Sequence, residues 1–110
     1  MPNPTRKDQL LALLTESPED SFLLFALAKE FEKEMEFTSA VGRYQRLIIQ
    51  DPSYLGAYYH LGQLFIRIGD RDQARSTFQQ GISKSLELND LHARSELQAA
   101  LRELEIGDLG

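Results

Sequence analysis

Apolar residues recur along this chain at the three- and four-residue spacing of amphipathic helices. One run of this kind passes through Leu24 and Phe31, and another passes through Tyr58 and Phe65. Each run is followed by a second run with the same spacing. The pattern therefore predicts two helix-turn-helix units, which are defined by Leu24, Leu27, Phe31, Ala40, Tyr44, Leu47 and Ile48 and by Tyr58, Leu61, Phe65, Ala74, Phe78 and Ile82.

The two units repeat each other at an offset of 34 residues, which is the separation of Leu24 and Tyr58. In the second unit, Gly69-Asp70 predicts that the first helix ends with a glycine in the left-handed conformation. Met35-Glu36 stands at the same place in the first unit and is a weaker stop. The offset preserves size or helix-breaking role in Pro18 and Pro52, Leu24 and Tyr58, Leu27 and Leu61, Ala28 and Gly62, Phe31 and Phe65, Ala40 and Ala74, and Tyr44 and Phe78.

Gly62 lies inside a predicted helix, where glycine costs about 1 kcal/mol relative to alanine. The period places Gly62 and Ala74 on the facing surfaces of two antiparallel helices, where small side chains allow a close approach. Phe65 and Phe78 are expected to fill the space above and below this contact. Gly81 is a candidate for a second close approach.

These residues resemble the tetratricopeptide repeat (TPR) family, whose motif also spans 34 residues. The second unit reads Y-x2-L-G-x2-F-x8-A-x3-F-x2-G, and the first reads L-x2-L-A-x2-F-x8-A-x3-Y-x2-L and then Pro52. The departures are Leu24 in place of tryptophan, Leu47 in place of a small residue and Leu86 in place of a proline. The last of these predicts that the preceding helix continues toward Glu87 or Leu88.

The resemblance implies an all-α fold, an alpha-alpha superhelix in which antiparallel helix pairs form a right-handed solenoid of about six helices. We expect one domain over residues 1–110. Its parts are an N-terminal helix at 5–16 that begins at the capping sequence Thr5-Arg6-Lys7-Asp8, repeats at 21–54 and 55–88, and a capping helix at 89–105. The two glycines in the final IGDLG predict fraying there.

The composition favours a soluble protein that is not an enzyme. The chain has no cysteine, and its two histidines, His60 and His92, are too far apart in sequence for a short metal-binding motif. Motifs for nucleophilic catalysis or phosphate binding do not occur, so we expect no catalytic residue, metal or cofactor. Its net charge of −5 without a basic stripe argues against nucleic acid, and short apolar runs argue against a membrane span or a signal peptide. We expect a cytoplasmic protein.

The TPR resemblance also implies a concave groove, lined by the first helix of each repeat, that holds a peptide or a partner helix. The groove positions implied by the family register are Phe22, Phe25, Lys29, Glu32, Lys33, Tyr59, His60, Gln63, Ile66, Arg67, Asp90, Ala93, Arg94 and Leu97. Phe22 and Phe25 have an alternative role in the core against the N-terminal helix, which is favoured for Phe22. The candidate peptide-binding residues are Phe25, Lys29, Tyr59, His60, Gln63, Ile66, Arg67 and Arg94.

One known use of this groove in the family, a clamp for the carboxylate of chaperone tails, is disfavoured. Of the matching positions only Arg94 has the required type of side chain, and Asp90 would repel an anion. We therefore predict an adaptor that binds an apolar or amphipathic protein segment. The alternative is a scaffold domain that forms homo-oligomers, including homodimers, through the apolar face of the terminal helix at Leu91, Leu97 and Leu104 or through the groove.

Overall fold

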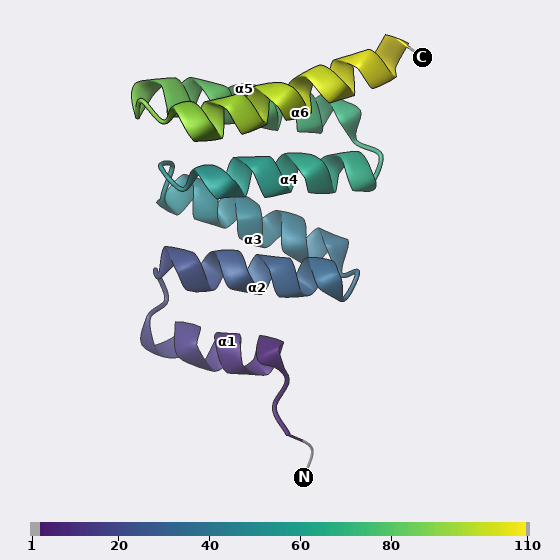
Figure 1. Cartoon of the computed structure of the whole chain (residues 1–110). Helices are drawn as coiled ribbons and strands as arrows, with labels where there is room; N and C mark the ends of the chain where they lie inside the picture. Colours follow the sequence, from purple (N-terminus) through teal and green to yellow (C-terminus); the bar gives the residue numbers. More distant parts are fainter. Residues whose placement is uncertain (1–2, 110) are drawn as a thin grey trace. The chain divides into compact units, whose positions relative to one another are not determined.

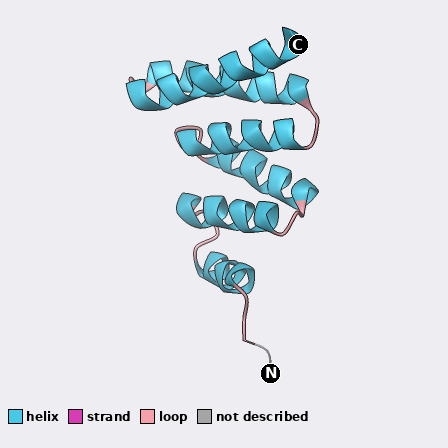
Figure 2. Cartoon of the chain, turned by 45° about the vertical axis from the view of Figure 1, so that its right-hand side comes forward, coloured by secondary structure: helices cyan, strands magenta, loops and turns pink. Residues whose placement is uncertain are grey.

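Six α-helices make up most of residues 3–109, the part of the chain that the computed structural model describes (Figure 1). They are α1 Arg6–Glu16, α2 Ser21–Lys33, α3 Phe37–Gln50, α4 Leu55–Arg67, α5 Arg71–Glu87 and α6 Leu91–Leu109. Short loops join them, and residues 3–109 contain no strand (Figure 2). The predicted all-α class is confirmed. Within the same range no helix is both long enough and apolar enough to cross a membrane.

The helices form two units, one that ends at Asp51 and one that begins at Pro52. The first contains α1, α2 and α3, and the second contains α4, α5 and α6. In each unit the neighbours along the chain pack against each other, and α6 also contacts α4. The prediction that residues 1–110 form one domain stays a prediction.

Hydrogen bonds at the helix ends explain where the helices start and stop. Thr5 and Asp8 form a reciprocal capping box at the start of α1, as their sequence predicted. At the end of α4, Gly69 has φ 88° and the Asp70 amide donates to the Phe65 carbonyl at 2.8 Å. Met35 adopts φ 62° at the same place after α2, although it is not glycine. The weaker stop therefore uses the same geometry at a higher conformational cost.

The core of the first unit centres on Tyr44, which is fully buried on α3. Its hydroxyl donates to Glu32 Oε1 at 2.9 Å, and burial together with this carboxylate raises the pKa of Tyr44. Lys7 on α1 pairs with Glu34 and Glu36, which follow α2. The other apolar residues buried in this unit are Leu10, Leu14, Leu24, Ala26, Leu27, Ala28, Ala40 and Leu47.

Two glycines shape the core of the second unit. A Cβ atom on Gly62 would lie within 2.7 Å of three ring carbons of Phe78. This corrects the predicted packing, because Phe78 lies directly against Gly62 and not above or below it. A Cβ on Gly81 would lie 2.7 Å from Tyr58 Cβ and 2.9 Å from Leu97 Cδ1, so Gly81 is the second close approach. Glycine lets α5 contact α4 at one point and both α4 and α6 at the other.

The last turn of α6 is held by two arginines of α5. Asp108 pairs with Arg71 and Arg75, and Arg71 Nη2 donates to the Leu104 carbonyl at 2.9 Å. The hydrogen bond from Arg71, supported by Arg75, lowers the pKa of Asp108 below its usual value. The helix therefore continues to Leu109, where fraying was predicted. The two arginines lie far from Asp108 in sequence, so local composition gave no sign of them.

Replacing Gly42 with alanine is expected to stabilise the protein by about 0.5–1 kcal/mol. Gly42 lies inside α3, its surface is exposed, and a Cβ there would have no atom within 4 Å. The substitution thus removes the conformational cost of glycine without creating a clash. Urea denaturation followed by circular dichroism measures the change. A loss of stability would mean that the space beside Gly42 is filled in solution.

Candidate functional site

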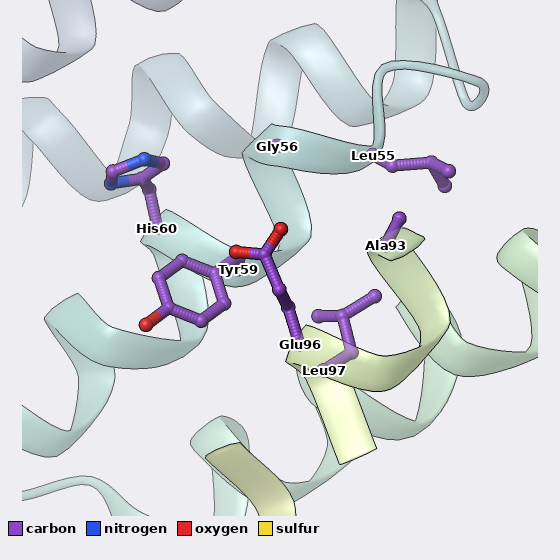
Figure 3. Close-up of a pocket in the computed structure, with 7 residues that line it drawn as sticks. All are labelled: Leu55, Gly56, Tyr59, His60, Ala93, Glu96 and Leu97. Carbon is purple, nitrogen blue, oxygen red and sulfur yellow. The ribbon is translucent and has the colours of Figure 1, made fainter. Parts of the chain in front are cut away.

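A small pocket opens in the second unit between the first half of α4 and the first half of α6 (Figure 3). Its volume is about 120 Å³. Figure 3 shows the residues of α4 on one side and those of α6 on the other. The lining residues are Leu55, Gly56, Tyr59 and His60 from α4 and Ala93, Glu96 and Leu97 from α6.

The pocket combines apolar side chains with two polar groups. Leu97 is buried, and Leu55 and Ala93 are partly buried. The rings of Tyr59 and His60 meet edge to face, with their centroids 5.5 Å apart. Such a surface can take an aliphatic side chain and offer hydrogen-bonding partners at its edge.

Glu96 gives the pocket a negatively charged rim. Its Oε1 atom lies 2.7 Å from Nε2 of His92, one turn earlier on α6. Both side chains are largely exposed, so this pair is worth little to stability and is screened by salt. The Glu96 carboxylate is therefore open to exchange His92 for a cation on a ligand.

Of the eight candidate peptide-binding residues, Tyr59 and His60 line the pocket and the other six lie outside it; Ala93 and Leu97, which were also predicted groove positions, line it too. Gln63, Ile66 and Arg67 follow along α4, with Gln63 and Ile66 partly buried and Arg67 exposed. Arg94 lies on α6 and is partly buried; its Nε atom is buried without a hydrogen-bond partner among the described residues.

The other two candidates, Phe25 and Lys29, belong to the first unit. Phe25 is partly buried and packs edge-on against Tyr44, with ring centroids 6.1 Å apart. Lys29 is exposed, and its Nζ atom lies 5.6 Å from the centre of the Phe25 ring. Phe22 is 63% exposed, so the core role that was favoured for it is wrong.

Leu97 also differs from its prediction, because the family register directs it outward. It is 1% exposed and packs against α5 near Gly81. Helix α6 is therefore turned so that Leu97, Ala100 and Leu104 face the inside of the second unit. Leu97 and Leu104 cannot form the oligomer surface that the sequence suggested, and of the three residues only Leu91 is exposed.

Leu55, Gly56 and Glu96 line the pocket but were not among the predicted groove residues. Gly56 stands 34 residues after Phe22, which was among the groove positions, so the repeat offset alone could have identified it. No such signal marks Glu96, whose place depends on the rotation of α6. Among the described residues, no group of three or more His, Cys, Asp or Glu side chains is placed to hold a metal ion.

Comparison with known proteins agrees with this architecture. A family model described as "Tetratricopeptide repeat" matches residues 56–84. The chain is 40% identical to a tetratricopeptide repeat domain protein from Salinibacter ruber, whose solution structure superposes with a TM-score of 0.76. That match covers 80% of this chain and 89% of the other. The chain therefore belongs to the tetratricopeptide repeat family.

Two further proteins extend the comparison. A TPR repeat-containing protein from Pseudomonas aeruginosa is 28% identical over 84% of this chain and 89% of its own length. The TPR2B domain of yeast Sti1, in a complex with pHsp70, has a TM-score of 0.83 at 20% identity and covers 92% of this chain and 81% of its own. At that identity the likeness concerns the fold alone.

Proposed function

We propose that this TPR domain is a non-enzymatic adaptor that binds a peptide or protein segment through its first helices, with the α4–α6 pocket as one contact. The observation that carries the proposal is the pocket itself, which joins apolar residues, an aromatic edge and one exposed carboxylate. Protein binding is also the role of the same fold in Sti1, which was solved in a complex with pHsp70.

The chemistry of the pocket suggests what the segment carries. Leu55, Ala93 and Leu97 suit an aliphatic side chain of the ligand, whose burial would supply most of the affinity. Glu96 suits a neighbouring lysine or arginine. Asp90 is exposed and accepts from the Ala93 amide at 3.0 Å, where it adds to the negative charge at this end of α6. An anionic chain terminus would be repelled there, so we propose an aliphatic residue beside a basic one.

The remaining candidate residues have separate places in the proposal. Gln63, Ile66 and Arg67 continue along α4 from the pocket and would contact the next residues of the ligand. Phe25 and Lys29 give the first unit an aromatic and cationic surface of its own. Each is tested by alanine substitution in the same assay.

Replacing Tyr59 with alanine is expected to weaken ligand binding about tenfold or more, because truncating an aromatic anchor costs more than about 1 kcal/mol. No ligand is in hand, so a displayed library of random peptides is first selected on the wild-type domain. Fluorescence anisotropy then gives the affinity of a selected peptide for the wild type and for the Tyr59→Ala variant. Peptides rich in aliphatic and basic residues are expected.

Leu86→Ala is the matched control, since Leu86 is an exposed apolar residue of α5 that does not line the pocket. This variant should bind the selected peptide as the wild type does. Circular dichroism checks that both variants keep their helix content. Equal affinity for the wild type and the Tyr59→Ala variant would contradict the proposed site, and a selection without any specific peptide would contradict the proposed peptide binding.

A further inference from the structure

A second hollow surface lies on the first unit, where α1 and α3 both pack against α2 (Figure 1). It consists of two depressions, with volumes of about 190 Å³ and about 410 Å³. Pro18 and Arg46 line both of them, so the two depressions adjoin each other. We call them together the α1–α3 groove. Its lining includes Leu11, Leu14, Pro18, Leu24, Arg43 and Arg46.

The narrower depression offers apolar surface to a ligand. Leu11 of α1 is 38% exposed, and Pro18 after the same helix is exposed as well. Leu14 and Leu24 line the depression too, although both are buried in the first unit. An aliphatic side chain that entered here would remove apolar surface of Leu11 and Pro18 from water, which favours binding.

Two arginines of α3 line the same depression. Arg43 and Arg46 are three residues apart, so they lie on one face of the helix. Neither forms an ion pair with any of the described residues. The Cζ atom of Arg43 lies 5.6 Å from the centre of the Phe31 ring, a contact that leaves N–H groups of the guanidinium available. Both arginines can therefore donate to a carboxylate of a ligand.

The second repeat has no arginine at the corresponding positions. The 34-residue offset takes Arg43 to Thr77 and Arg46 to Gln80. Both of these side chains are uncharged, and each donates a hydrogen bond within α5. The packing that the two repeats share therefore does not explain arginine at positions 43 and 46, which leaves a role in binding open to both residues.

The charge of the groove changes sign along its length. Glu19 and Asp20 line the wider depression together with Arg46. Asp20 also caps α2, because its side chain accepts from the Leu23 amide at 3.0 Å. A carboxylate of a ligand is thus attracted to the arginine end of the groove and repelled at Glu19 and Asp20. The groove favours one direction of a bound segment as well as one sign of charge.

We propose that the α1–α3 groove binds a protein segment in which an aliphatic residue stands close to an acidic one. The aliphatic side chain covers Leu11 and Pro18, and the carboxylate accepts hydrogen bonds from Arg43 and Arg46. The wider depression falls within the range of about 300–1,000 Å³ that is usual for ligand sites, so the groove has room for more than one side chain. This inference does not depend on the α4–α6 pocket, for which a basic segment is proposed.

A displayed library of random peptides tests the proposal. It is selected on the wild type, and peptides that also bind the Arg43→Gln, Arg46→Gln double variant are removed. Glutamine is a good helix former and already stands at position 80 of the second repeat, so this variant is expected to fold. The remaining peptides should carry Asp or Glu within two positions of an aliphatic residue. If no peptide remains, or if the remaining peptides lack acidic residues, the proposal is wrong.

Fluorescence anisotropy then measures the affinity of one selected peptide. The double variant is expected to bind it about tenfold more weakly or worse, because two charge-assisted contacts at an accessible site are lost. Arg102→Glu is the control, since Arg102 is an exposed residue of α6 and this change lowers the net charge by two, as the double variant does. The control should bind as the wild type does. An equal loss in both variants would mean that net charge attracts the peptide and would contradict the proposed groove.

Leu11→Gln tests the apolar part of the groove. It is expected to weaken binding of the same peptide roughly threefold, because the peptide loses part of its apolar contact. Leu13→Gln is its control on the same helix, since Leu13 is 53% exposed and lines neither depression. Circular dichroism and urea denaturation check that every variant is folded. If the two glutamine variants of α1 bind equally well, the peptide does not contact Leu11 and the proposed site is wrong.

A second copy of the chain is another occupant to be tested, because the chain is itself acidic, with a net charge of −5. Sedimentation equilibrium compares the wild type with the Arg43→Gln, Arg46→Gln double variant. The two are expected to have the same mass at every concentration used for peptide binding. Self-association of the wild type that the double variant loses would assign the groove to a second copy and overturn the proposal.

Discussion

Replacing Gly62 with valine is expected to lower the free energy of unfolding by about 3 kcal/mol or more, at the upper end of what overpacking costs. The ring of Phe78 already occupies the place of a side chain at position 62, and Phe78 has no exposed surface into which it could move. The added methyl groups would force α4 and α5 apart along the whole pair. Urea denaturation followed by circular dichroism measures the loss.

A second substitution shows whether the clash with Phe78 is the cause. Phe78→Ala alone is expected to cost about 3–5 kcal/mol, since it leaves a cavity in the core. In the Gly62→Val, Phe78→Ala double variant, the valine methyl groups fill part of this cavity. The double variant is therefore expected to be more stable than the sum of the single losses by about 1–3 kcal/mol. Strictly additive losses would show that Gly62 and Phe78 do not interact as the structure indicates.

Gly62 also shows how far the sequence could lead. The period placed Gly62 on the surface between two helices, because apolar spacing identifies the buried face of a helix. It named Phe78 as a residue beside this contact but could not place the ring directly against Gly62, because that depends on how far each helix slides and turns against the other. Periodicity predicts which residues face inward, and packing decides which of them touch.

The residues of the pocket could likewise be predicted from the sequence only in part. Tyr59 and His60 were predicted because α4 keeps the full repeat pattern. Glu96 and the burial of Leu97 were not, because α6 departs from the pattern and its rotation is determined by contacts with α5, including the one at Gly81. The family register thus placed Tyr59 and His60 at the pocket within a complete repeat, but on the helix that follows the repeats it indicated neither Glu96 nor the burial of Leu97.

Leu97→Glu is the second substitution with a large expected effect, and its result bears on every test of self-association. Leu97 is 1% exposed, so glutamate there loses apolar burial and places a carboxylate in the core. Loss of a buried leucine costs about 2–5 kcal/mol, and an unpaired buried charge adds to this. We expect α6 to detach from α4 and α5, with a loss of helix content and a lower urea midpoint.

Leu91→Glu is the matched control on the same helix, because Leu91 is 65% exposed. Its urea midpoint should correspond to a stability within about 0.5 kcal/mol of the wild type. If Leu97→Glu is as stable as Leu91→Glu, then α6 does not pack through Leu97 in solution. If Leu97→Glu unfolds as expected, any loss of self-association in the Leu97→Glu variant is a consequence of its lost structure. Self-association through α6 must therefore be tested at exposed positions such as Ala99, where the helix keeps its fold and only the outward surface changes.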